Sequence, residues 1–236
     1  MISLSIEEVV NKFNNFRVGF VVAENLEVSP LRSEELNKYI VESELKVSEE
    51  LAGLELGDLP EVQCWRRTYK QFGVKKTSYR SSVERLLKAI QKGKGLPKIF
   101  NLVDVYNTTS ILWRMPVGAD DLDKVIQPQA FRFARDADTF IALGDKEQTI
   151  NLPVTGEVVY ADAQKCLCRR WNWYQDARSS VSLNTNRAIL TVQTIEPLLA
   201  AKLEDAVEDL CTQLNRFCKA TTKWSIADAD NSSISL

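Results

Sequence analysis

The stretch Tyr160–Leu190 constrains the fold of this 236-residue chain more than any other segment. An extended backbone would place Cys166, Cys168, Arg170, Asn172 and Tyr174 on one face, and Leu167, Arg169, Trp171 and Trp173 on the other. This period of two with aromatic residues predicts a half-buried strand. Because polar side chains among buried rings need hydrogen-bond partners, the strand is predicted to line a pocket; the alternative is a sheet edge with a solvated hairpin. The chain then returns as a second strand at residues 187–192.

The remaining patterns predict an α+β fold. Apolar residues recur at helical spacing in residues 33–54, 82–91, 97–113 and 196–220, and strand-like runs occupy residues 16–28, 131–143 and 152–159. Ser33, and Ser81 or Ser82, are suitable N-caps for two of the helices. Helices come first, strands follow and one helix closes the chain, which is typical of α+β proteins with a sheet-rich centre. The polar tail 227–236 is expected to be flexible.

Histidine is absent from the sequence, and this excludes Ser-His-Asp and Cys-His catalysis and histidine-ligated zinc. Any chemistry must use carboxylates, Lys, Cys, Tyr, Ser/Thr, the backbone or the substrate. The net charge of −2 argues against a uniformly basic nucleic-acid binder, so DNA is not an expected partner. Five scattered cysteines, acids near the N-terminus and no apolar run of membrane-spanning length indicate a cytoplasmic protein without a membrane partner. Cys166 and Cys168 are predicted to be packed rather than to bind metal.

Charge is distributed unevenly along the chain. Residues 1–61 contain 13 acids and 5 bases, whereas residues 66–98 contain 11 bases and a single acid, Glu84. Four aromatic residues are interleaved with these bases: Trp65, Tyr69, Phe72 and Tyr79. Because basic groups and aromatic rings suit a phosphate backbone and unstacked bases, the segment predicts an RNA- or phosphate-facing surface; the alternative is a solvated helical face.

Two further polar patterns occur in the centre of the chain. Asn101, Asp104 and Asn107 form a stripe along the predicted helix 97–113. A structural role, in which the stripe pins neighbouring loops, is favoured over ligand binding. The loop 114–124 carries three acids in four positions but lacks the spacing of a calcium loop, so it is predicted to cap a helix or form a pocket wall. No metal or other cofactor is expected.

Three stretches together resemble a known family: residues 79–107 (YRSSVERLL…KIFNLVDVYN), 116–125 (PVGADDLDKV) and 160–190. They resemble the B3/B4 domain of the phenylalanyl-tRNA synthetase beta subunit, and more closely its stand-alone relatives. The family patterns correspond here to Asn101, Asp104 and Asn107, to Pro116, Ala119 and Asp121-Leu122-Asp123, and to Ala161-Asp162 and Thr185. The resemblance covers about residues 79–195, and nothing resembles the synthetase catalytic domain.

The resemblance implies a single domain over residues 1–236, a three-layer α+β structure with a central β-sandwich of unusual topology and flanking helices. In this interpretation residues 1–78 supply an N-terminal strand and helix, and residues 196–220 the closing helix. The resemblance also implies tRNA handling and hydrolysis of a mischarged aminoacyl ester, as in the family's editing site and its deacylases acting in trans. An aminoacylated tRNA is the expected partner, contacted by Arg66, Arg67, Lys70, Lys75, Lys76 and Arg80. The expected substrate-binding residues are Gly118, Ala119, Asp121, Asp123, Asn172, Trp173, Gln175 and Asp176.

Two departures from the family pattern bear on activity. Gly118 stands where the synthetase loop usually carries a histidine. The synthetase's Gly-Gly-Glu turn falls near Gln175-Asp176, with bulky residues over 171–174 in place of the glycines. Asp176, with Asp121 or Asp123 nearby, is expected to read a cationic or polar amino-acid side chain by charge-assisted pairing. The alternatives to a deacylase are a non-catalytic tRNA-binding module and a protein that binds a free amino acid.

Overall fold

The structure is a computed structural model that describes residues 1–74 and 79–236. The helices are α1 (Glu7–Val10), α2 (Glu34–Glu50), α3 (Pro60–Gln71), α4 (Ser82–Gln91), α5 (Asn101–Trp113), α6 (Pro197–Ala200) and α7 (Leu203–Cys218), with 3-10 turns η1 (Leu56–Asp58) and η2 (Leu122–Lys124). The strands are β1 (Ser3–Ser5), β2 (Arg17–Glu24), β3 (Val117–Asp121), β4 (Gln129–Phe133), β5 (Phe140–Ile141), β6 (Ile150–Asn151), β7 (Val158–Ala161), β8 (Cys166–Arg169), β9 (Tyr174–Gln175), β10 (Ala188–Thr194), β11 (Thr221–Ala227) and β12 (Ser233–Ser235).

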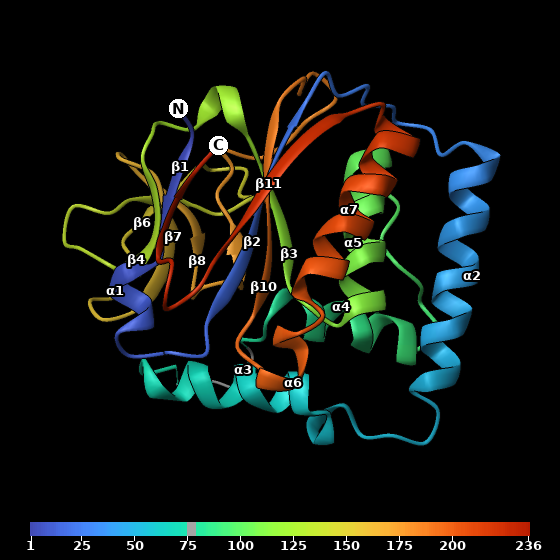
Figure 1. The fold of residues 1–236 in the computed structure, drawn as a ribbon, viewed down its shortest axis with the longest axis horizontal. Helices are drawn as coiled ribbons and strands as arrows, with labels where there is room; N and C mark the ends of the chain where they lie inside the picture. Colours follow the sequence, from blue (N-terminus) through green and yellow to red (C-terminus); the bar gives the residue numbers. More distant parts are fainter. Residues whose placement is uncertain (75–78) are drawn as a thin grey trace.

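These elements form three layers (Figure 1). One sheet has the strand order β11-β2-β10-β3, and a second has the order β12-β1-β4-β7-β8-β9. Helices α5 and α7 cover one face of the first sheet, and the second sheet lies beyond its other face. β5 and β6 form a separate two-stranded ribbon. The predicted three-layer α+β fold is therefore confirmed.

The central strand β2 shows why the layers pack closely. Residues 18–23 are all buried, as expected for a strand covered on both faces. At Gly19 a β-carbon would collide with Val207 of α7, so the glycine permits close approach of helix and strand. The structure contains no helix, within the part of the chain it describes, that is long and apolar enough to cross a bilayer.

Local capping explains where several helices begin. Ser33 accepts a hydrogen bond from Leu36 N at the start of α2, and Ser81 accepts one from Glu84 N at the start of α4, so both predicted caps are confirmed. α5 begins four residues later than the predicted helix 97–113, because the backbone stays extended up to Phe100. The predicted helix 196–220 is divided into α6 and α7. α3 was not predicted as a helix.

The aromatic stretch after β8 forms a turn rather than the predicted continuous strand. Arg170 and Trp171 have left-handed φ values of 46° and 69°, which reverse the chain between β8 and β9. Trp171 is fully buried, and its ring packs against the rings of Phe13, Phe16 and Trp65 at centroid distances of 5.0, 4.8 and 5.5 Å. This anchor holds the turn in place and lets the residues beside it face a cavity.

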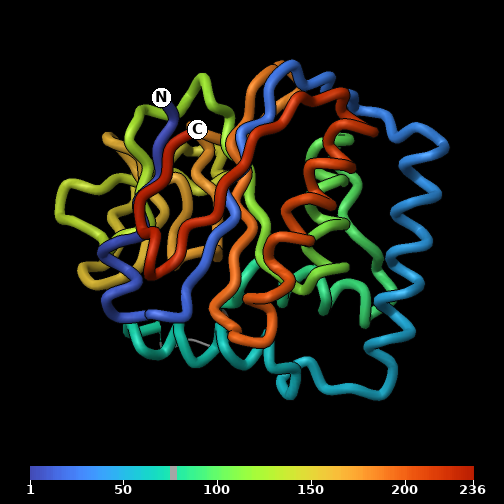
Figure 2. The backbone as a smooth tube through the Cα atoms, in the orientation of Figure 1, coloured from blue at the N-terminus to red at the C-terminus, as the bar shows by residue number. Residues whose placement is uncertain are grey.

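The two described ends of the chain lie side by side (Figure 2). β1 pairs antiparallel with β12, with Leu4 opposite Ile234. Ile234 is buried, and the amides of Ile2 and Leu236 each donate to the other's carbonyl. The expectation of a flexible tail over residues 227–236 is therefore wrong, because a buried isoleucine and backbone pairing hold the segment in the sheet.

Candidate functional site

A cavity of about 440 Å³ lies between α4, α5, β3, β10 and the β8–β9 turn. Apolar and aromatic side chains form most of its wall, which is the usual character of a small-molecule site. The wall comprises Ser82, Arg85, Leu86, Ala89, Pro97, Ile99, Val103, Tyr106, Asn107, Val117, Gly118, Asp120, Leu143, Tyr160, Cys168, Asn172, Trp173, Tyr174, Gln175, Thr191 and Gln193.

Asp120 supplies the cavity with a buried carboxylate. Strand alternation places Gly118 and Asp120 on the cavity face of β3, while Ala119 and Asp121 point away from it. The side chain is 3% exposed and accepts a hydrogen bond from Gln175 Nε2. Burial raises the pKa of Asp120 to about 7, against the lowering effect of hydrogen bonds from Ser179 and Gln175. The carboxyl group can therefore take up or release a proton near neutral pH.

A chain of hydrogen bonds connects the turn to β10 along another part of the wall. Tyr69 Oη donates to Asn172 Oδ1 at 2.8 Å, and Asn172 Nδ2 donates to Gln193 Oε1 at 3.1 Å. Gln193 Nε2 in turn donates to Thr191 Oγ1 at 3.0 Å. All four residues are buried, so the network fixes the orientation of the amides that reach the cavity.

Gly118 leaves open space at the position where the family resemblance expects a histidine. A β-carbon built there would have Thr191 Oγ1 as its nearest atom, 4.0 Å away. Since Gly118 lines the cavity, any longer side chain would project into it. Cys168 also reaches the wall, but burial raises the pKa of its thiol to about 12, which does not suit a thiolate nucleophile.

The structure brings four of the expected substrate-binding residues to the cavity: Gly118, Asn172, Trp173 and Gln175. Ala119, Asp121, Asp123 and Asp176 do not line it. Asp120 was missed, although the alternation of its own strand would have identified it as the acid that shares a face with Gly118. That inference required β3 to be recognised as a strand, and the run of acids suggested a loop instead.

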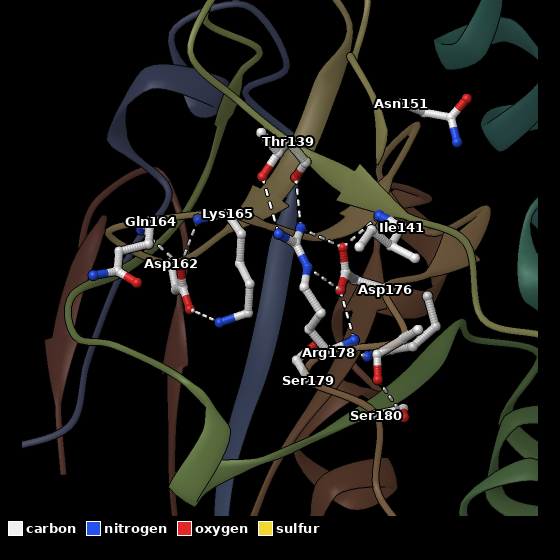
Figure 3. Close-up of polar contacts among 12 residues, drawn as sticks. Thr139, Ile141, Asn151, Asp162, Gln164, Lys165, Asp176, Arg178, Ser179 and Ser180 are labelled. Atoms are coloured by element: carbon white, nitrogen blue, oxygen red, sulfur yellow. Dashed lines mark hydrogen bonds and ion pairs between the residues drawn. The ribbon is translucent and has the colours of Figure 1, made fainter. Parts of the chain in front are cut away.

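Asp176 has a structural role in place of the expected role in substrate recognition. It is fully buried, and both carboxylate oxygens are bound by Arg178, at 3.0 Å to Nε and 2.8 Å to Nη2 (Figure 3). The backbone amides of Ile141 and Arg178 also donate to it, at 2.9 and 2.7 Å. A carboxylate with these partners ties the loop after β9 to β5 and is not available to a ligand.

The other two expected acids stabilise the segment after β3. Asp121 accepts hydrogen bonds from Thr185 Oγ1 at 2.8 Å and from Asp123 N at 3.2 Å, so it caps η2. Asp123 is exposed and forms an ion pair with Arg187 at 3.2 Å. This arrangement agrees with a helix-capping loop. The part of the chain that the structure describes has no group of three Cys, Asp or Glu residues arranged to hold a metal ion.

The polar stripe of α5 has a divided role. Asn101 pins two loops, since its Oδ1 accepts from Ser29 N at 2.8 Å and its Nδ2 donates to the carbonyls of Glu27 and Phe217 at 2.9 Å. Asp104 is fully buried and forms an ion pair with Arg32 at 2.7 Å. These two residues have the predicted structural role, whereas Asn107 lines the cavity.

The basic residues predicted to contact RNA are placed differently from one another. Arg66 and Arg80 both form ion pairs with the buried carboxylate of Glu84, at 2.7 and 2.8 Å, so Glu84 partly neutralises their charges. Arg67 and Lys70 are exposed on α3. Lys75 and Lys76 lie outside the described residues.

Comparison with known protein families places this chain in one of them. The sequence profile of the family described as B3/4 domain matches residues 64–233. The chain therefore belongs to the B3/4 domain family, as its sequence patterns predicted. No curated protein matches the chain.

Among solved structures, the chain is similar to an N-terminal fragment of the phenylalanyl-tRNA synthetase beta-subunit from Pyrococcus horikoshii, with 12% identity and a TM-score of 0.49. The similarity covers 94% of this chain and 50% of that one, so this chain spans about half of the fragment.

Proposed function

We propose that this protein binds tRNA and hydrolyses a mischarged aminoacyl ester, as a trans-editing aminoacyl-tRNA deacylase. The observation that carries the proposal is the position of Asp120, a buried carboxyl group in the wall of a cavity of about 440 Å³. Membership of the B3/4 domain family supports it. The exposed bases on α3 supply positive charge for tRNA phosphates.

The reaction would need little from the protein, because aminoacyl esters are labile in water. A water molecule attacks the carbonyl carbon, the bond from that carbon to the ribose oxygen breaks, and the leaving oxygen takes up a proton. The ionised form of Asp120 can accept the proton of the attacking water, and a pKa of about 7 keeps a useful fraction ionised at neutral pH. This role requires no histidine.

The activity test uses purified protein and a panel of mischarged tRNAs, with release of the amino acid as the measurement. Asp120→Asn should lower the rate by roughly 10²–10⁴-fold, the usual contribution of a general base. Asp123→Asn removes an exposed carboxylate from the adjoining segment and serves as the matched control. No release above the water background from any tRNA would refute the deacylase. Normal activity of Asp120→Asn would refute only the role of Asp120.

Non-catalytic tRNA binding is the second candidate, favoured by the open space at Gly118, where the synthetase loop usually carries a histidine. It predicts salt-sensitive binding without deacylation. The double variant Arg67→Glu and Lys70→Glu should weaken binding, because both side chains are exposed on α3. The control variant carries Glu35→Lys and Glu42→Lys on the exposed face of α2, and it changes the net charge by the same amount in the opposite direction. It should not weaken tRNA binding. Unchanged affinity of the α3 variant would show that this helix does not face tRNA.

Binding of a free amino acid is the third candidate. The mixed wall of the cavity, with one acid and several amides among apolar side chains, would also accept such a ligand. A thermal-shift series distinguishes it, since a free amino acid would raise the melting temperature while tRNA would not.

A further inference from the structure

Arg170 is a half-buried cation without a counter-ion among the residues that the structure describes. Its guanidinium group forms no ion pair or hydrogen bond with residues 1–74 or 79–236. Every other arginine in these ranges that is buried or half-buried pairs with a carboxylate. Glu157 carries a negative charge that acts on Arg170, but its carboxylate is already bound by the side chain of Arg169, at 2.9 and 2.8 Å, and by the backbone amide of Arg170.

Two aromatic rings hold this guanidinium in place. Its central carbon lies 3.7 Å from the ring centroid of Tyr79 and 4.5 Å from that of Trp173. The two rings pack edge-on against each other at 4.9 Å. Stacking on the rings uses none of its N–H donors, and residues 1–74 and 79–236 supply no acceptor for them.

The stacked group lies next to the cavity. Trp173, which touches Arg170, is part of the cavity wall, and so is Arg85, whose Nη2 donates to the Trp173 carbonyl at 2.8 Å. Arg85 likewise has no carboxylate partner among the described residues. Burial lowers the pKa of Arg170 below its ordinary value, because removing a charge from water costs free energy. An anion bound here would offset that cost.

We propose that Arg170, with Arg85 in the same aromatic cluster, binds a backbone phosphate of a single-stranded RNA segment that leads into the cavity, with Trp173 and Tyr174 in the cavity wall as stacking surfaces for its bases. A phosphate fits better than a free carboxylate because the donors are embedded in aromatic rings, the combination that unpaired nucleotides require. The inference rests on the proposed function, since it names the part of the tRNA that enters the site: the unpaired 3′ end.

The test measures binding of two probes, a deacylated tRNA transcript and the same transcript without its unpaired 3′ nucleotides. Arg170→Gly removes the guanidinium and accepts the left-handed backbone at this position. Arg170→Lys keeps the charge but loses the planar fork. Arg17→Ala removes an exposed arginine outside the cavity wall and is the control. Thermal unfolding verifies that each variant is folded.

Wild-type protein should bind the full transcript more tightly than the shortened one. Arg170→Gly should weaken binding of the full transcript about tenfold and leave the shortened one nearly unchanged, with Arg170→Lys between them. If Arg170→Gly loses the same affinity for both transcripts, or loses none, the inference is overturned. If Arg170→Gly does not fold, Arg170→Lys tests the inference by the ratio of its affinities for the full and the shortened transcripts. Deacylation is assayed separately: its absence refutes the proposed function, whereas Arg170-dependent binding would still stand.

Discussion

Asp120→Asn should change how the stability of this protein depends on pH. Asp120 is buried in the cavity wall, and burial raises its pKa from 3.8 to about 7. Asparagine has nearly the same shape but cannot titrate. The amide of Gln175, which donates to Asp120, can reorient to present its oxygen to the new side chain. The difference between the wild type and Asp120→Asn therefore reports on one proton-binding group.

The expected magnitude follows from the raised pKa. Between pH 4 and 7 the native carboxyl group keeps a proton that the unfolded chain has lost, so stability decreases as the pH rises. The stability from this group is fully present below the unfolded pKa and is lost as the pH passes through about 7. At about 1.36 kcal/mol for each pKa unit, the wild-type protein loses about 2.5 kcal/mol through Asp120 between pH 5 and pH 8. The variant lacks this loss.

Urea unfolding at pH 5, 6, 7 and 8 measures the difference directly. The free energy of unfolding of Asp120→Asn minus that of the wild type should rise by about 2.5 kcal/mol over this range. Asp123→Asn controls for the loss of one negative charge at the surface. If the wild-type and Asp120→Asn profiles run parallel, the carboxyl group is ionised throughout, and its proposed role as a proton acceptor tuned to neutral pH is wrong.

Two further substitutions test the fold and the cavity wall by urea unfolding. Gly19→Ala should destabilise the protein by roughly 1–3 kcal/mol because the new methyl group collides with α7, whereas Gly118→Ala, which meets open space, should have little effect. Equal effects would show that close packing at β2 is not the cause. Asn172→Ala should cost roughly 2–4 kcal/mol because Tyr69 and Gln193 lose their buried partner. A cost below 1 kcal/mol would mean that water replaces the amide.

The sequence predicted the parts of this fold that depend on local patterns. The caps at Ser33 and Ser81 and the apolar stripe of α7 have local causes, and the α+β class followed from the order of the elements. α3 was missed because its many basic residues indicated an RNA-facing surface, and the helical spacing of its buried residues was overlooked. The tail was misjudged because its polar composition says nothing about pairing with β1, which lies at the other end of the described chain.

The site was only partly predictable because it depends on the direction in which each side chain points. The run of acids at residues 120–123 lies beside the loop that follows Asp176, because Asp120 pairs with Ser180. Which carboxylate faces the cavity depends on strand register and on competing partners such as Arg178, and neither can be read from residue types alone. Asp120, with amide and hydroxyl neighbours and no arginine, is the acid that remains available.

The pairing of β1 with β12 has a consequence for folding during synthesis. β1 is made before the other strands described here, and β4 can pair with one of its edges once residues 129–130 have emerged. The other edge stays open until Ser233–Ser235 are made, more than two hundred residues later. An unpaired strand edge is a template for association with other chains. Nascent chains of this protein should therefore be most prone to aggregate just before β12 is made, and slow synthesis at that stage should lower the yield of folded protein.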